Sequence, residues 1–427
     1  MRIVHVAAGA AGSYCGACTH DTTLSRGLAT RGHDVEFIAL YTPVHVDRDD
    51  FQSCPIFYGA INAYLQQHSA FFQHTPEFVD RLLDNGWLLG QLGRFAADTH
   101  PEDLGEMTVS VLMGPEGRQR KELERLVEYL EALPRPDVIS LTNSLLSGLA
   151  PTLHERLKVP VVCRLQGEEA FVSRLGTPYD AQAGDLIRRN ARSIAGFVSP
   201  SQAYADEMAA FLDVPRDRIH VIHPGVDCSV YGETSPPVQG PFRIGYLGRL
   251  SPVKGIDLLC EAFATLEEER PGGATLEVAG QALGDAAVFW KKLETQLAVK
   301  GLAQRVSRLD APDFQAKLDF QRRTSVFAFP SRFPERLAMS CLEAMASGRP
   351  VVVPAHGVFT EIVGKTGGGI LVRPDDVGAL TDALRSLRDD PARAKALGLA
   401  ARAGVLADYS AENMVQRTLE LFESLIG

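Results

Sequence analysis

The sequence predicts an α/β fold in which parallel sheets are covered by helices on both faces and divided between two domains. Strand-length apolar runs alternate with helical patterns from end to end, as in parallel sheets. Several runs are almost continuously apolar, as strands buried on both faces are. These runs are residues 35–40, 159–163, 244–247, 326–329 and 350–353. A Gly- and Pro-rich stretch, residues 232–241, interrupts the pattern and predicts a linker.

Length and composition are those of a water-soluble globular protein. The 427 residues suffice for two or three domains, and 45% hydrophobic with 22% charged residues is ordinary. A net charge of −10 argues against general nucleic-acid binding and does not indicate membrane association. No apolar run approaches membrane-span length, and the short opening run carries His5, which favours a first strand over a signal peptide. We therefore expect a cytoplasmic protein.

The seven cysteines are odd in number and fall mostly in expected strands or helices, which indicates reduced thiols. Cys15 and Cys18 form a CxxC pair that could serve redox chemistry. No second pair completes a zinc site, so we favour small residues that let the backbone approach a ligand. Asp47 and Asp49 have the spacing of a metal-binding D-x-D motif, but a surface loop is the better interpretation.

In the first domain, the short apolar run at residues 2–7 predicts a first strand that leads directly into a βα turn. Residues 51–135 are the least regular part, and we expect a helical insertion there. The aromatic and amide-rich stretch 57–67 is the alternative, a sugar-binding surface. Residues 117–128 predict a charged helix with a solvated face.

The most informative window of the second domain is residues 326–353. It predicts a buried strand, a loop with Pro, Ser and Arg, a helix ended by Gly348, and another buried strand. If residues 335–343 were all helical, the carboxylates of Glu335 and Glu343 would lie about 80° apart around the axis and about 12 Å along it. That spacing suits two ends of one polar ligand. A helix start at the carboxyl edge of a parallel sheet also favours anions. The plain alternative is an ordinary αβ unit with two solvated glutamates.

Motifs along nearly the whole chain resemble those of one enzyme family. Glu335 and Glu343, with seven residues between them, resemble the E-x7-E signature of the retaining GT-B glycosyltransferases, family 4 in particular. Other stretches resemble the same family in the same order. They are residues 2–7 with Gly9, Gly12 and Gly16, residues 31–35, 136–139, 218–227, 245–255 and 369–376.

The resemblance implies a GT-B fold, with two Rossmann-like domains facing across a cleft. The expected domains are residues 1–235 on the acceptor side, 241–408 for the nucleotide-sugar donor, and a final helix within 409–427 that packs back on the first domain. The implied reaction is transfer of a hexose from a nucleoside diphosphate sugar to an acceptor, with retention, without a metal and without a cofactor.

Candidate site residues follow from these motifs. Arg249 and Lys254 flank a glycine loop directly after a strand, where both cations could reach a diphosphate. By resemblance, Glu335 would bind sugar hydroxyls and Glu343 the ribose. The same resemblance implies that the backbones of Gly12, Gly16, Ala338 and Met339 approach the donor.

Two stretches depart from the family pattern. Arg336-Leu337-Ala338 replaces a usual Gly-Phe-Gly, so the conformationally free glycines are missing. Gln166 stands where many relatives carry a histidine that contacts the donor sugar, and an amide relays no proton at neutral pH. His20 and Asp21 are candidates to compensate, although Asp21 could instead cap a helix.

These departures leave rival functions open. One is a GT-B epimerase or phosphorylase, and another is a protein that binds sugar nucleotides without catalysis. A dehydrogenase is disfavoured, because the loop from Gly9 to Gly12 lacks the GxGxxG spacing.

Overall fold

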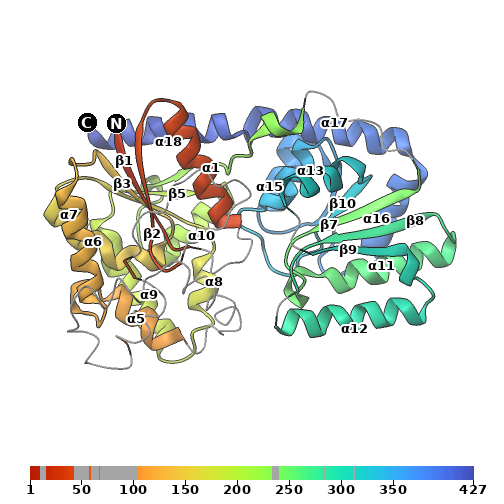
Figure 1. Ribbon diagram of the computed structural model, residues 1–427, viewed down its shortest axis with the longest axis horizontal. Helices are drawn as coiled ribbons and strands as arrows, with labels where there is room; N and C mark the ends of the chain where they lie inside the picture. The colour runs from red at the N-terminus through yellow and green to blue at the C-terminus, as the bar shows by residue number, and fades with distance from the viewer. Residues whose placement is uncertain are drawn as a thin grey trace. The chain divides into compact units, whose positions relative to one another are not determined.

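The computed structural model describes residues 1–9, 16–42, 57–58, 67, 104–232, 240–282, 284–310 and 313–427. Its contacts divide the chain into unit 1, Met1–His223 with Met414–Gly427, and unit 2, Pro224–Asn413 (Figure 1). This division falls before the expected linker. The reason is a short parallel bridge: Val226 N–H donates to Tyr409 O at 2.9 Å, and Ala411 N–H donates to Val226 O at 2.9 Å, so the chain joins unit 2 from residue 224 onward.

Unit 1 contains a six-stranded parallel sheet in the order β2-β1-β3-β4-β5-β6. The strand order reverses between β1 and β3, where Ile3 pairs with Val138. In open α/β sheets, ligands bind beyond the carboxyl ends of the strands at such a reversal. The strands are β1 (Arg2–Ala7), β2 (Asp34–Ala39), β3 (Val138–Leu141), β4 (Val161–Arg164), β5 (Gly196–Ser199) and β6 (Ile219–Val221).

Helices cover both faces of this sheet. Because neighbouring residues of a strand point to opposite faces, each strand contributes side chains to two cores. Ile3 packs with α1 and α18 on one face, and Val4 packs with the remaining helices on the other. The C-terminal helix α18 thus shares its core with α1, through Val415 and Leu24 among others (Figure 1). The helices are α1 (Gly16–Thr30), α5 (Gly105–Leu112), α6 (Arg120–Ala132), α7 (Ala150–Leu157), α8 (Glu168–Val172), α9 (Tyr179–Asn190), α10 (Gln202–Leu212) and α18 (Ala411–Ile426).

Unit 2 repeats this architecture with the strand order β12-β11-β10-β7-β8-β9, again all parallel. Here the order reverses between β7 and β10, so the loops that follow these two strands meet at one edge of the sheet. The strands are β7 (Phe242–Leu247), β8 (Ala274–Ala279), β9 (Val306–Leu309), β10 (Val326–Ala328), β11 (Val351–Pro354) and β12 (Gly369–Val372).

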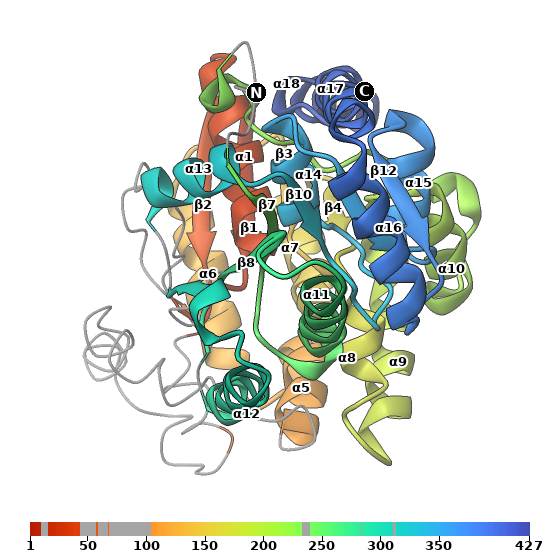
Figure 2. The same cartoon turned by 90° about the vertical axis from the view of Figure 1, so that its right-hand side faces the viewer.

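The second sheet is also covered on both faces. On one face, Val326 and Val352 pack with α11, α12 and α16, and on the other, Phe327 packs with α13, α14, α15 and α17 (Figure 2). These helices are α11 (Ile256–Glu269), α12 (Asp285–Val299), α13 (Phe314–Arg323), α14 (Met339–Ala346), α15 (Val358–Thr366), α16 (Val377–Asp389) and α17 (Pro391–Asp408). Glu335 lies in the loop between β10 and α14, and Glu343 lies inside α14, so the spacing worked out for a continuous helix from 335 to 343 does not apply.

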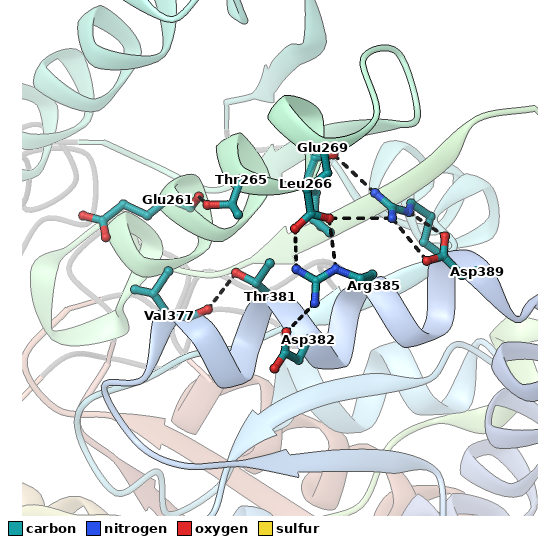
Figure 3. A network of polar contacts seen from close by, with 10 residues as sticks. Glu261, Thr265, Leu266, Glu269, Val377, Thr381, Asp382, Arg385 and Asp389 are labelled. Atoms are coloured by element: carbon teal, nitrogen blue, oxygen red, sulfur yellow. Dashed lines mark hydrogen bonds and ion pairs between the residues drawn. The ribbon is translucent and has the colours of Figure 1, made fainter.

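Helices α11 and α16 are joined at the surface by an ionic network (Figure 3). The guanidinium of Arg385 holds the Glu269 carboxylate through Nε, at 2.9 Å, and Nη2, at 2.5 Å, and also contacts Asp382. Arg388 adds a hydrogen bond to Leu266 O at 3.2 Å. Exposed pairs of this kind contribute little stability individually, but the geometry is bidentate and tied to both helices.

Much of the expected helical insertion, with residues 59–66, 68–103 and the Asp47/Asp49 motif, lies outside the described residues. Helices α5 and α6 belong to its described part. In the part of the chain that the structure describes, no helix is both long and apolar enough to cross a bilayer.

Candidate active site

In unit 2, the loop after β7 and the loop after β10 bring Lys254 and Glu335 together. The Lys254 ammonium lies 2.5 Å from Glu335 Oε1. Ser331 donates its hydroxyl to the same carboxylate oxygen at 2.8 Å. Both charged side chains remain partly exposed, at 34% and 17%. An ammonium has three donors, so Lys254 can keep this contact and still bind an anion.

Arg332 fastens the two loops to each other. Its Nη1 and Nη2 atoms hold the two oxygens of Asp257, at the start of α11, at 2.8 Å each. Its Nε donates to Asp375 at 2.6 Å, and Nη1 also donates to Pro252 O at 2.6 Å. Planar bidentate pairs restrict orientation as well as distance. The short 3₁₀ turn Pro252–Lys254 is therefore fixed at both ends.

Gly255 permits the close approach of the two loops. It has a φ of +69°, and a Cβ there would lie 1.9 Å from Pro330 O. The left-handed conformation and the missing side chain are both required. Gly357 has a similar role beside Glu335, because its φ is +57° and a Cβ would lie 2.7 Å from Glu335 O.

Helix α14 begins directly after the glutamate loop, and its first residue is Met339. Ala338 is its N-cap and adopts the left-handed conformation, with φ +50° and ψ +39°, although it is not glycine. Among the described residues, no side chain caps the first turn of this helix. Ala338 thus retains a backbone shape that glycine usually supplies, and the N–H groups of the first turn favour an anion.

Glu343 lies inside α14 and forms a buried ion pair with Lys317 of α13, with 3.1 Å between Nζ and Oε1. The Lys317 ammonium also lies 5.7 Å from the Phe314 ring centroid. Burial of a carboxylate is costly without a partner, and Lys317 supplies the opposite charge.

Two further arginines, Arg249 and Arg336, belong to the loops that follow β7 and β10. Arg249 is exposed, and its carbonyl accepts a hydrogen bond from the Tyr246 hydroxyl at 2.7 Å, which holds the turn after β7. Arg336 lies over the Phe333 ring at 5.9 Å.

In unit 1, Gln166 follows β4 and is joined to the α1 helix. Its Nε2 donates to Asp21 Oδ1 at 3.0 Å and lies 3.3 Å from Thr142 Oγ1, directly after β3. The Thr142 hydroxyl donates to the other oxygen of Asp21 in a short hydrogen bond. Asp21 lies inside α1, so the interpretation of Asp21 as a helix cap is wrong.

A buried charged cluster surrounds Asp21. His20 Nδ1 lies 3.2 Å from Asp21 Oδ1, and Arg164 Nη2 lies 3.3 Å from His20 Nε2. Burial alone would raise the pKa of Asp21, but hydrogen bonding from His20 and the proximity of His5 outweigh it and lower that pKa. Burial, then Arg164, lower the pKa of His20, and burial lowers the pKa of Arg164 to about 10. At neutral pH the cluster therefore holds an ionised Asp21, a charged Arg164 and a neutral His20.

The turn after Gln166 is held by backbone hydrogen bonds. Gln166 N–H donates to Glu168 Oε2 at 2.7 Å, and Gly167 N–H donates to the Tyr204 hydroxyl at 2.9 Å. Glu168 also accepts from Ser144 N–H at 2.9 Å. Burial raises the pKa of Glu168, against the effect of these hydrogen bonds.

Other expected residues are placed as follows. Gly16 is the exposed first residue of α1, and Cys18 is buried in the same helix. Gly12 and Cys15 lie outside the described residues. Within the described ranges, no cluster of three or more His, Cys, Asp or Glu side chains could hold a metal ion.

Three further residues of these clusters were not predicted from the sequence: Arg164, Lys317 and Arg332. Each had a weak signal: Arg164 ends an apolar strand, Lys317 interrupts the buried face of a helix, and Arg332 precedes Glu335 in the loop. The partners of Arg332 are 43 and 75 residues away, so no local pattern indicates them.

Two family descriptions match the chain. "Glycosyl transferase 4-like domain" matches residues 16–225, and "Glycosyl transferases group 1" matches residues 241–390. Each range covers most of one sheet and its helices.

Known relatives agree with these matches. The chain is 31% identical over 244 residues to the lipopolysaccharide core biosynthesis mannosyltransferase LpsB of Rhizobium meliloti, covering 52% of this chain and 65% of LpsB. It is 30% identical over 210 residues to the D-inositol 3-phosphate glycosyltransferase of Streptomyces avermitilis, covering 46% of this chain and 45% of the relative. The chain thus spans less than two thirds of either relative.

A similar solved structure is that of Anabaena HepE in complex with UDP and glucose, with a TM-score of 0.69, 19% identity and full coverage of both chains. At this identity the likeness establishes the fold, which is GT-B with two Rossmann-like parallel-sheet units. The fold and both family matches lead to one assignment: the chain belongs to the group 1, family 4-like glycosyltransferases.

Proposed function

We propose that this protein is a retaining glycosyltransferase that transfers a hexose from a nucleoside diphosphate sugar to an acceptor. The observation that carries the proposal is the arrangement of Lys254, Glu335 and the α14 N-terminus at the strand-order reversal of unit 2. It combines a cation, a carboxylate that could accept hydrogen bonds from hydroxyls and the N-terminal N–H groups of a helix, at the edge where α/β sheets bind ligands.

The donor's diphosphate would be bound by Lys254 and Arg249, with the N–H groups at Ala338 and Met339. Glu335 would accept hydrogen bonds from the sugar hydroxyls, and Glu343 from the ribose. Carboxylates suit these roles because each accepts from paired hydroxyls. Positive charge at the phosphates stabilises the leaving group, which these groups can do without a metal.

The bond changes are a same-face exchange at the anomeric carbon. The bond from that carbon to the phosphate oxygen breaks, and its electron pair leaves with the nucleoside diphosphate. The acceptor oxygen forms its bond on the same face, and its proton passes to an oxygen of the leaving phosphate. Gln166 would bind the substrate during this exchange. His20 would act as a positioning residue, because its Nδ1 faces Asp21 and its Nε2 faces Arg164.

The first test is nucleotide binding. Thermal-shift titrations with UDP, GDP and ADP, and with their hexose conjugates, should show selective stabilisation that persists in EDTA. UDP and GDP are the leading probes, since HepE was solved with UDP and LpsB is a mannosyltransferase. Persistence in EDTA is expected because protein cations and N–H groups supply the positive charge.

Variants then locate the site. Lys254→Ala and Glu343→Ala should each weaken nucleotide binding by roughly tenfold to hundredfold, since hydrogen bonds to charged groups contribute about 1.5–3 kcal/mol. Lys300→Ala is the control, because Lys300 is exposed and pairs at the surface with Glu268. Wild-type affinity in both site variants would remove these residues from the nucleotide site.

Catalysis is tested by product analysis with the donor so identified. Retention of anomeric configuration in the product, measured by NMR, supports the proposal. Inversion, epimerised sugar, or a requirement for inorganic phosphate would refute it in favour of another reaction. Binding without turnover over a broad acceptor panel would indicate a non-catalytic sugar-nucleotide-binding protein.

A further inference from the structure

We propose that Asp21 and Thr142 fix the side-chain amide of Gln166 so that Gln166 accepts a hydrogen bond from a sugar hydroxyl and cannot donate one. The protein would then select substrates that carry a hydroxyl at that position. This inference rests on the glycosyltransferase function proposed above, and it adds a rule of specificity to it.

The neighbours of Gln166 fix the orientation of its side-chain amide. Nε2 of Gln166 lies 3.0 Å from Asp21 Oδ1 and 3.3 Å from Thr142 Oγ1. An ionised carboxylate only accepts hydrogen bonds, so the NH₂ end of the amide must face it. Asp21 stays ionised, because hydrogen bonding from His20 keeps its pKa low despite burial. Rotation of the amide by half a turn would place two oxygens against each other.

The side chains around Asp21 donate their hydrogen bonds toward its carboxylate. Arg164 has donors only, so its Nη2, 3.3 Å away, makes Nε2 of His20 an acceptor. The neutral His20 ring then carries its proton on Nδ1, which donates to Asp21 at 3.2 Å. The Thr142 hydroxyl donates to the other oxygen of Asp21. These neighbours therefore all donate toward Asp21, and the Gln166 amide has no alternative orientation.

The backbone at Gln166 is also held by hydrogen bonds to side chains. Its N–H donates to Glu168 Oε2 at 2.7 Å, and the next N–H, of Gly167, donates to the Tyr204 hydroxyl at 2.9 Å. Side chains from α8 and α10 thus fix the turn, while α1 and the β3 end fix the amide. The residue is therefore rigidly held.

The remaining group is the amide oxygen. Oε1 of Gln166 is buried and has no hydrogen-bond partner among the described residues. Buried polar atoms are paired in the great majority of cases. This unpaired acceptor lies beyond the carboxyl ends of β3 and β4, beside the strand-order reversal of unit 1 where α/β sheets bind ligands, so it calls for a donor from a ligand. A sugar hydroxyl provides one. A fluorine atom in place of the hydroxyl cannot donate a hydrogen bond, and a hydrogen atom in its place can neither donate nor accept one.

The test is turnover of donor sugar analogues. For the sugar nucleotide that the wild type uses, a set with each hydroxyl replaced singly by fluorine or by hydrogen is compared in kcat/KM for nucleoside diphosphate release. At one ring position we expect the fluoro and deoxy analogues to be equally poor, by roughly tenfold to hundredfold, as for loss of a hydrogen bond to a buried group.

Two variants connect this discrimination to the amide. In Asp21→Asn, the new amide can accept or donate, so Gln166 can turn and the hydroxyl-to-fluoro ratio should fall to within about threefold. In Gln166→Met, which leaves Asp21 with His20 and Thr142, the ratio should fall in the same way. Asp185→Asn is the matched control, since Asp185 is exposed on α9 and pairs with Arg188. It should keep the wild-type ratio.

Each outcome decides the matter. Discrimination that persists in Gln166→Met overturns the inference even if Asp21→Asn fails to fold. A wild type that turns over parent and fluoro donors equally at every position also overturns it, while the glycosyltransferase function stands. A wild type that releases no nucleoside diphosphate from any sugar nucleotide overturns the proposed function and this inference with it.

Discussion

Gly255 supports the most quantitative prediction, because its replacement by alanine tests how tightly the Lys254 loop must lie on the Glu335 loop. Alanine at Gly255 encounters two obstacles. The backbone has a φ of +69°, and the new Cβ would lie 1.9 Å from Pro330 O, about 1 Å closer than real Cβ contacts come. The adjacent residue is Lys254, so any relief of this overlap moves the proposed phosphate ligand.

The change in the free energy of unfolding caused by Gly255→Ala is the sum of a backbone contribution and a packing contribution. Left-handed backbone costs alanine about 1–2 kcal/mol, and the stiffer unfolded chain returns about 0.4–1 kcal/mol. Overpacking against a carbonyl adds about 1–3 kcal/mol. Gly255→Ala should therefore lower the free energy of unfolding of unit 2 by about 2–4 kcal/mol.

Two other glycines of unit 2 separate these contributions. Gly301 has a φ of +74°, and a Cβ there would meet no described atom within 4 Å, so Gly301→Ala should cost about 0.5–1 kcal/mol, the backbone part alone. Gly364, inside α15, has ordinary φ and the same open space, so Gly364→Ala should stabilise by about 0.5–1 kcal/mol.

Urea denaturation of the three variants beside the wild type measures the series, and nucleotide titration measures its effect on the site. We expect the stability order Gly364→Ala, wild type, Gly301→Ala, Gly255→Ala, with weakened nucleotide binding in Gly255→Ala alone. If Gly255→Ala is no less stable than Gly301→Ala, the close approach of the two loops is not required. If it is less stable but binds nucleotide normally, the loop position does not govern the site.

Two further predictions concern Arg332 and His20. Arg332→Lys should weaken nucleotide binding several-fold, because lysine cannot make the bidentate contact with Asp257. Arg385→Lys, which breaks the similar pair in Figure 3, is the control and should leave nucleotide binding unchanged. Equal effects of the two variants would show that unit 2 as a whole is loosened. Burial, then Arg164, hold the pKa of His20 below its ordinary value, so the folded protein keeps this ring neutral. Above about pH 6.5 the ring is also neutral in the unfolded chain, and it does not affect stability. As the pH decreases below that value, the unfolded chain binds a proton that the folded protein does not, and the free energy of unfolding falls by up to about 1.4 kcal/mol per pH unit. His20→Gln should flatten this fall between pH 7 and 5 in urea denaturation, and an unchanged slope would refute the buried neutral histidine.

The fold was largely predictable because its strands are buried on both faces. The apolar runs 326–329 and 350–353 correspond to β10 and β11 within about two residues, since burial on both sides leaves no polar alternation. The edge strand β9 was missed. Its residues are partly or fully exposed and mixed in character, so their pattern resembles a loop.

For the candidate site, the sequence indicated some of the residues but not their contacts. Lys254 and Glu335 stand in recognisable loops, but their 2.5 Å contact joins residues 81 apart. The Lys317–Glu343 pair depends on how α13 packs on α14, which periodicity does not specify. Ala338 shows the reverse case: its conformation is local, but it opposes the preference of alanine, so packing around the loop determines it.

The discontinuity of unit 1 has a consequence for synthesis of the protein. Chains are made from the N-terminus, and about 190 residues of unit 2 separate His223 from Met414, which at about 5–20 residues per second takes roughly 10–40 s. During that interval the apolar surface formed by Ile3 of β1 with Leu24 and Leu28 of α1 has no α18 to cover it. Unit 2 is continuous and can complete its core on the ribosome, whereas unit 1 waits for the last helix with apolar surface exposed, the condition under which nascent chains need chaperones.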